Sequence, residues 1–439
     1  MKTKSVLVAL TFAASFACAA LMPALPPSDW RDRLKEAIGR AAAENPEIAE
    51  MEARITAARH RVPQATALPD PEIELGLKDV PVSNPSLTSD PMTMEMIGAR
   101  QRFPGAGKLP AEKRAAQAEL EGMEAEHSRH VAEVAADVAD SFFRLAAFDR
   151  RIAIARETRQ RLSDAVTVAR ERYRVGKGAQ ADVLRADLER TALEDRLAGL
   201  AGERRSEAAR WNSLQNLPAS SEVHPVAVED DCESRVAAHP VPSASELTRM
   251  AEQESPSMTA AAAGVRRGEA RLEGVRLERR PDWMLEGYYG RREKFEDMAG
   301  ISVSFSLPWV HPKRLDERQA EREAELSSAR AGVSAVRNIL RRDIEQAWSD
   351  LAKNRDQARL YRESVLPQAE INYRAAREAY SVGSIDFLTY VRAATDLDMY
   401  QSEFIERETG AARALAALQR ASGLPLIEGT PATGGIHAE

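Results

Sequence analysis

The sequence predicts a fold that is mainly α with membrane β, built from two copies of one unit. Three observations carry this prediction: short segments of alternating polarity, long helical runs almost free of proline, and matched dipeptides that recur in order. Each unit reads as a helix, a β-hairpin and a long helical hairpin. We expect the copies at residues 20–218 and 244–426, with a linker at 219–243 and a loose tail at 427–439.

The duplication rests on four pairs of matched dipeptides. They are Pro69-Asp70 and Pro281-Asp282, Phe103-Pro104 and Leu307-Pro308, Val175-Gly176 and Val382-Gly383, and Leu217-Pro218 and Leu424-Pro425. The members of each pair lie about 204 to 212 residues apart and follow the same order in both halves. Chance matches would not keep both order and spacing, so the halves are expected to share one structure.

The first residues predict export. Lys2 and Lys4 precede an apolar run, and small residues surround Cys18, which is typical of a signal peptide over residues 1–19. Lipidation of Cys18 after cleavage is a second reading, although Ser15-Phe16-Ala17 is a poor lipoprotein box. If Cys18 leaves with the signal, Cys232 remains alone and no intrachain disulfide forms. The net charge of −7 argues against a nucleic-acid partner.

Four strands are expected, at about 71–78, 92–103, 281–290 and 298–307. In the last of them, Ile301, Val303, Phe305 and Leu307 alternate with serines. Successive strand residues point to opposite faces, so one face is apolar and the other polar. This alternation is typical of a barrel strand with its apolar face toward lipid and its polar face toward the lumen.

The helical runs are unusually long. After the helix expected from Trp30 to His60, no proline occurs between Pro110 and Pro218, and a turn near Gly176 divides that run into two antiparallel helices. Apolar residues recur along it at spacings of three and four, as in a coiled coil: Val131, Val134, Val138, Phe142 and Leu145. About 60 helical residues would extend roughly 90 Å. A second run of about 65 residues follows the last strand, interrupted only by Pro367.

Four strands per chain cannot close a barrel, because the smallest closed bacterial barrels have about eight. An open strand edge in lipid would leave backbone groups without hydrogen bonds. Several copies are therefore expected to share one barrel, with their helical hairpins packed into a tube below it. The sequence thus predicts a homo-oligomeric conduit.

One segment resembles a known family. The run from Arg100 to Leu109, Arg-Gln-Arg-Phe-Pro-Gly-Ala-Gly-Lys-Leu, is similar to the strand-to-helix signature Q-x-F-P-x-x-G-K of TolC-type outer-membrane efflux proteins, especially their cation-efflux branch. The matching positions are Gln101, Phe103, Pro104, Gly107 and Lys108, with Leu307 and Pro308 in the second copy. The segments after the two Val-Gly turns resemble the family too, and the resemblance covers nearly the whole chain after the signal.

The resemblance implies a homotrimer with a shared twelve-stranded outer-membrane β-barrel, continued by a periplasmic α-helical barrel. It implies a passive duct with no cofactor and no enzymatic activity, which docks to a periplasmic adaptor (membrane fusion) protein and to an inner-membrane pump of the resistance-nodulation-division type. The docking tip would include Gly176, Asp182, Arg185, Gly383, Asp386 and Arg392. Heavy-metal cations are the expected cargo on this resemblance alone, and drugs stay an open alternative.

The chain departs from the family at the expected mouth of the tunnel. In well-known members, acidic residues just past the second Val-Gly turn constrict the tunnel. The positions that resemble them here hold Thr389 and Arg392. Whether a carboxylate ring forms is therefore open. Asp182 and Asp386 have a structural reading as well, because a carboxylate is favourable at a helix N-terminus.

Two groups of residues are candidate metal ligands. His127 and His130, beside Glu124 and Glu126, could face one metal ion, but a solvated helix face is the favoured reading. Met92, Met94 and Met96 alternate on a strand with Glu95 between them, and thioethers suit soft Cu(I). If Glu95 faces the lumen, these methionines face lipid, which is the orientation we expect.

Two other functions receive less support. Gly105-Ala-Gly-Lys108 lies between a strand and a helix, as a phosphate loop does, but Arg102 stands where a glycine is needed and Leu109 where Ser or Thr is needed. No arrangement of catalytic residues is recognisable. The alternative to a channel is a periplasmic coiled-coil adaptor or scaffold, which would have one helical hairpin flanked by small β-domains.

Overall fold

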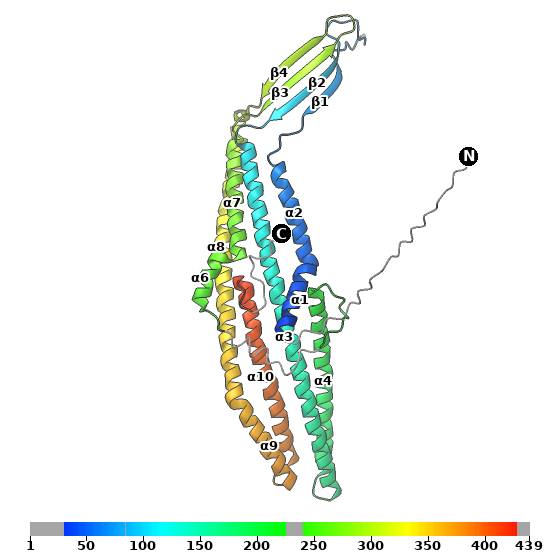
Figure 1. Cartoon of the computed structure of the whole chain (residues 1–439), viewed down its shortest axis with the longest axis vertical. Coiled ribbons are helices and arrows are strands. Elements are labelled where there is room, and N and C mark those ends of the chain that lie inside the picture. Colours follow the sequence, from blue (N-terminus) through cyan, green and yellow to red (C-terminus); the bar gives the residue numbers. More distant parts are fainter. Residues whose placement is uncertain (1–29, 84, 225–239, 428–439) are drawn as a thin grey trace, which may run out of the picture.

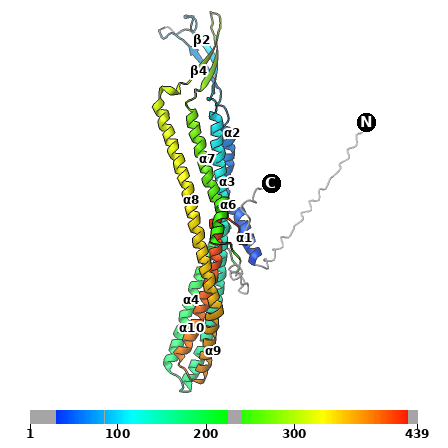
Figure 2. The same ribbon diagram turned by 90° about the vertical axis from the view of Figure 1, so that its left-hand side faces the viewer.

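The chain is long and narrow, with a β-sheet at one end and helices running away from it (Figure 1). The computed structural model describes residues 30–83, 85–224 and 240–427. The predicted signal peptide with Cys18, Cys232, most of the predicted linker and residues 428–439 of the predicted tail lie outside the described residues. Turned by 90°, the molecule is equally slender, and α4, α9 and α10 lie together at the end opposite the sheet (Figure 2).

The first half contains the predicted helix, hairpin and helical hairpin. Its elements are α1 (Trp30–Glu44), α2 (Pro46–Gln64), β1 (Glu72–Lys78), β2 (Met94–Phe103), α3 (Lys108–Arg174) and α4 (Gln180–Leu214). The single helix expected from Trp30 to His60 is wrong in one respect, since it breaks at Asn45. The Asn45 side chain accepts a hydrogen bond from the Glu47 N–H at 2.9 Å and so caps a new helix that starts with Pro46.

The second half repeats this order. Its elements are α6 (Ala244–Glu254), α7 (Pro256–Leu277), β3 (Trp283–Arg291), β4 (Met298–Phe305), a 3₁₀ turn (Pro308–Val310), α8 (Pro312–Leu360), a π-helical turn η2 (Tyr361–Val365), α9 (Leu366–Val382) and α10 (Phe387–Ser422). Ser255 and Pro256 repeat the break made by Asn45 and Pro46. The wide π turn lies just before Pro367, which has no N–H to give to the preceding helical turn.

The four strands form one antiparallel sheet in the order β1-β2-β3-β4. Their bounds differ from the expected ranges by at most two residues at each end. The pairing of β2 with β3 joins the two repeats, with Phe103 opposite Trp283 and Glu95 opposite Arg291. This arrangement is not what the adaptor interpretation requires, because one sheet is shared by two helical hairpins.

Two buried clusters hold the helices together. The middle cluster packs α1, α2, α3, α6, α8 and α10 around Trp30, Phe142 and Phe143. The lower cluster packs α3, α4, α9 and α10 around Leu162, Leu193 and several aromatic rings. The predicted seam is confirmed, since its five residues are all buried: Val131, Val134, Val138, Phe142 and Leu145. None of the described helices has a stretch long and apolar enough to cross a membrane.

The predicted tail starts one residue too early. Ile427 is only 3% exposed and belongs to the middle cluster. Its N–H donates to the Gln419 side chain at 3.1 Å. This apolar side chain is therefore part of the core of the chain.

Candidate functional site

The sheet has one apolar and one polar face. In antiparallel pairs, opposed residues point to the same face. The apolar face is built from exposed side chains of all four strands: Ile73, Leu75, Leu77, Ile97, Leu285, Tyr289, Ile301, Val303 and Phe305. The other face carries Glu72, Glu74, Arg100, Glu286, Ser302 and Ser304. Ile301 is 83% exposed, and an apolar surface of this kind is what contact with lipid requires.

The orientation expected for the methionines is wrong. Met94 and Met96 oppose Lys78 and Gly76, so they lie on the polar face, whereas Glu95 opposes Leu77 on the apolar face. Glu95 lies next to Arg291, with 3.8 Å between their charged atoms, at the start of β2 and the end of β3. Glu95 is the second residue of β2 and Arg291 is the last residue of β3, so a charge at this end of the strands does not identify the polar face of the sheet.

The strand-to-helix signature forms the joint between sheet and helices. Gln101 Nε2 donates to the Pro69 carbonyl at 2.7 Å, and the Phe103 ring stacks on Trp283 with 4.0 Å between ring centres. Gly107 precedes α3 with φ of 91°, a conformation that favours glycine. In the second repeat, Pro308 begins the 3₁₀ turn, and Leu307 is exposed just before it.

Lys108 pairs with Asp282 of the other repeat. Its Nζ lies 2.6 Å from Asp282 Oδ1, and the Gly105 N–H donates to the same oxygen at 2.7 Å. Partial burial alone raises the pKa of Asp282, but the bonds from Lys108 and Gly105 outweigh it and hold the pKa below its ordinary value. Lys108 is thus committed to joining the repeats. In the sequence, Asp282 stands out only because Pro281-Asp282 repeats Pro69-Asp70.

At the opposite end, the two hairpin turns have the same construction. Gly176 has φ of 72° and Gly383 has φ of 81°. The Lys177 N–H donates to Arg172 O at 2.8 Å, and the Ser384 N–H donates to Ala379 O at 2.9 Å, which closes each helix in the same way. The preceding valines, Val175 and Val382, are both exposed. The tip therefore presents two turns of like backbone geometry, each with an exposed valine.

Arg172 joins the two turns. Its Nη1 donates to the Tyr380 carbonyl at 2.5 Å, and its guanidinium carbon lies 4.8 Å from the centre of the Tyr380 ring. Tyr380 in turn stacks on Tyr390, with 5.3 Å between ring centres. Burial raises the pKa of the Tyr390 phenol well above its ordinary value, so the ring stays neutral. The sequence pattern singles out neither this arginine nor the tyrosines.

The other predicted tip residues lie close to the turns in the chain. Asp386 caps α10 by accepting from the Thr389 N–H at 2.7 Å, and this bond lowers the pKa of the Asp386 carboxyl. Asp182 lies in the first turn of α4 and accepts from the Ala179 N–H at 3.4 Å. Arg185, Thr389 and Arg392 are exposed on the first turns of α4 and α10. The two aspartates thus have the helix-capping geometry that their positions predict.

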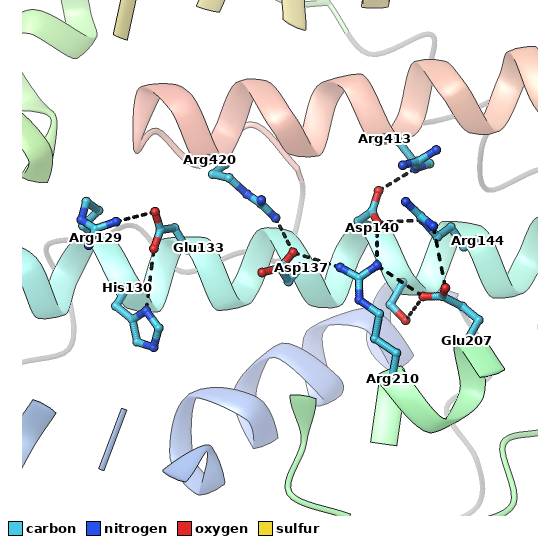
Figure 3. Close-up of polar contacts among 11 residues, drawn as sticks. Arg129, His130, Glu133, Asp137, Asp140, Arg144, Glu207, Arg210, Arg413 and Arg420 are labelled. Atoms are coloured by element: carbon cyan, nitrogen blue, oxygen red, sulfur yellow. Dashed lines mark hydrogen bonds and ion pairs between the residues drawn. The ribbon is translucent and has the colours of Figure 1, made fainter. Parts of the chain in front are cut away.

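A network of ion pairs joins the repeats between sheet and tip (Figure 3). Asp140 on α3 lies 2.6 Å from Arg413 of α10 and 3.4 Å from Arg210 of α4. Asp137 likewise contacts Arg420 and Arg210. Further down, Asp398 on α10 is buried and accepts from Arg196 and Thr158. These pairs fix α3 and α4 of the first repeat against α10 of the second.

His127 and His130 do not converge on one site. His130 Nε2 lies 3.2 Å from Glu47 and His127 Nε2 lies 3.8 Å from Glu52, both on α2. The predicted neighbours Glu124 and Glu126 lie on the helix of the histidines itself. Within the described ranges, no group of three His, Cys, Asp or Glu residues could hold a metal ion.

The chain is similar to outer-membrane efflux proteins both in sequence and in structure. The model of the outer membrane efflux protein family matches residues 37–217 and 247–424, one range in each half. The cobalt-zinc-cadmium resistance protein CzcC of Cupriavidus metallidurans is 25% identical over 366 residues, which is 82% of this chain and 82% of that protein.

Solved structures share the fold. The outer membrane protein VceC of Vibrio cholerae has a TM-score of 0.75 at 18% identity, over 89% of this chain and 96% of that one. CusC has a TM-score of 0.72 at 14% identity, over 91% and 95% of the two chains. The chain therefore belongs to the outer membrane efflux protein family, whose members are passive outer-membrane channels with a periplasmic helical tunnel and not enzymes.

Proposed function

We propose that the chain is the exit duct of a tripartite efflux system. Three copies would share one twelve-stranded barrel and one helical tunnel, and the tip would dock to a periplasmic adaptor served by an inner-membrane pump of the resistance-nodulation-division type. The observation that carries the proposal is the pair of like turns at Gly176 and Gly383, with Val175 and Val382 exposed beside them. At Gly176 nothing lies within 4 Å of the place where a side chain would begin, so another helical tip can approach this turn closely. At Gly383 the Arg172 guanidinium lies 2.9 Å from that place.

The proposed cargo is a heavy-metal cation. Its support is the similarity to CzcC, whose name assigns that protein to cobalt, zinc and cadmium resistance. Survival of a deletion strain on salts of these three metals and on a hydrophobic antibiotic, with and without the gene, separates metal cargo from drug cargo. Rescue on the antibiotic alone would overturn the metal assignment.

Docking is tested by Gly176→Arg and Gly383→Arg. Each substitution puts a bulky side chain on a turn that lies roughly 90 Å of helix away from the barrel, so the trimer should persist while resistance is lost. The matched control is Gly199→Arg, an exposed position on α4 with open space around it. Trimer is followed by mild gel electrophoresis.

The outcomes separate three roles for the turns. Trimer kept with resistance lost supports docking. Normal trimer with normal resistance would show that the turns only connect helices. Loss of trimer in both tip variants would show that they are needed for folding.

A further inference from the structure

The sheet ends in two strands that lack a second neighbour. Among the described strands, β1 pairs only with β2, and β4 pairs only with β3. The outer edges of both strands carry backbone N–H and C=O groups that lipid cannot satisfy. Their apolar side chains are strongly exposed, as Leu75 and Ile301 illustrate. An edge of this kind needs another strand.

Comparison of the two repeats indicates the register in which a further strand would pair with these edges. In the first hairpin Ile73 opposes Ala99, and in the second Leu285 opposes Val303. The matched dipeptides beside the strands fix the correspondence: Pro69-Asp70 recurs as Pro281-Asp282 after 212 residues, and Phe103-Pro104 recurs as Leu307-Pro308 after 204. Positions in the first strands therefore correspond at a spacing of 212 residues and those in the second strands at 204, which takes Ile73 to Leu285 and Ala99 to Val303. Adding 212 to the β1 residue and 204 to the β2 residue of any other pair in the first hairpin gives a pair of the second hairpin, wherever β3 and β4 extend that far. The two hairpins therefore have the same register.

The junction between repeats then serves as a template for the junction between subunits. In the chain, the second strand of repeat one pairs with the first strand of repeat two, with Gln101 opposite Leu285. The equivalent contact joins β4 of one subunit to β1 of the next. Gln101 corresponds to Phe305, and Leu285 corresponds to Ile73.

We propose that neighbouring copies of this chain close their barrel by pairing β4 with β1 in one defined register. Phe305 opposes Ile73 of the next copy, Val303 opposes Leu75, and Ile301 opposes Leu77. On the other face, Ser304 opposes Glu74 and Ser302 opposes Gly76. This inference rests on the proposed trimer and adds the residues that join its subunits.

The polarity of the side chains fits this register. All three apolar pairs fall on the lipid-facing side, and the serines fall beside Glu74 and Gly76 on the polar side. A slip of one residue would place Val303 opposite Glu74 or Gly76 and turn the apolar side chains of one strand toward the lumen. A slip of two residues keeps the faces, so it must be excluded by experiment.

Cysteine pairs measure the register directly. Opposed Cα atoms lie about 4.5–5.5 Å apart, within the reach of a disulfide, whereas diagonal neighbours at about 7–8 Å exceed it. In a Cys232→Ser background, Ser304→Cys with Glu74→Cys and Ser302→Cys with Gly76→Cys should give covalently linked dimers and trimers under mild oxidation. The exchanged pairs, Ser304→Cys with Gly76→Cys and Ser302→Cys with Glu74→Cys, use the same cysteines and should link at least five-fold less.

Each result decides the matter. Preferential linking of the exchanged pairs, or of Ser304→Cys with Glu72→Cys, would overturn this register and leave the shared barrel intact. No linking of any pair, in trimers that still confer resistance under reducing conditions, would show that β1 and β4 do not meet. Absence of trimer in unsubstituted protein would instead contradict the proposed function.

Discussion

One carboxylate, that of Asp282, joins the two repeats where the sheet meets the helices. It accepts from Lys108 and from the Gly105 N–H, and both lie in the signature that follows β2. A side chain on Gly105 would come within 2.8 Å of the Pro281 carbonyl, so the loop can approach so closely only as glycine. The signature therefore supplies two groups of a joint within this chain, a lysine and a glycine, and the other repeat supplies the acid.

Asp282→Ala should lower the stability of the trimer by about 1–3 kcal/mol at neutral pH, because it removes a charge-assisted hydrogen bond. The folded pKa of Asp282 lies below its ordinary value of 3.8, so this contribution is present above that value and is lost as the pH falls through the folded pKa. The measurement is the Tm of purified trimer at pH 7 and near pH 3, for the original and substituted chains.

The matched control is Asp316→Ala, which removes an exposed ion pair with Arg279 and should cost less than about 1 kcal/mol. A loss at Asp282 that stays the same at both pH values would show that the carboxylate charge is not the cause.

At the scale of elements, alternation and helix signals predicted the architecture well. The serine alternation located β4, and the valine seam located the buried face of α3. Two predictions were wrong for physical reasons. The faces of β2 were assigned the wrong way round, because the charge of Glu95 lies at the end of the strand beside Arg291 and does not mark the polar face. The break at Asn45 was missed because the cap competes with a helical pattern that runs on through it.

Some parts of the candidate site could not be read from the chain. Arg172 lies on α3 and contacts Tyr380 on α9, so their meeting depends on how the two hairpins pack. The same holds for Asp140 and Arg413, which come from different repeats. Charged residues are common on such long helices, and sequence alone does not tell a solvated charge from one that joins helices.

The faces of β4 give a second prediction. Val303→Arg should cost about 2–4 kcal/mol if the residue lies near the middle of the bilayer, because a cation there loses its water. Ser304→Arg, one residue away on the polar face, is the matched control and should still assemble. Folded trimer is measured by mild gel electrophoresis of detergent-extracted outer membranes. Equal loss in both variants would contradict the facing assigned to this strand.

At the scale of the molecule, the helical part has a middle and a lower region, and more helices pack together in the middle region than in the lower one. Six helices meet in the middle cluster, together with Ile427 near the C-terminus. In the lower cluster only the two hairpins meet, and Arg172 lies near their free end. The lower region contains the tip turns. Local opening should therefore start there and leave the middle region intact.

Hydrogen exchange of the purified trimer tests this difference. Amides of α9 and of the start of α10 should exchange at least ten-fold faster than those of α3 and α10 in the middle cluster, because fewer elements must separate to expose them. Arg172→Ala removes the bond to the Tyr380 carbonyl and should accelerate exchange further near both turns, with no change in the middle. Arg174→Ala is the control, because Arg174 is exposed and pairs only locally with Glu171. Uniform exchange along the helices would show that the helical part opens as one unit. Equal effects of the two substitutions would show that Arg172 does not stabilise the tip.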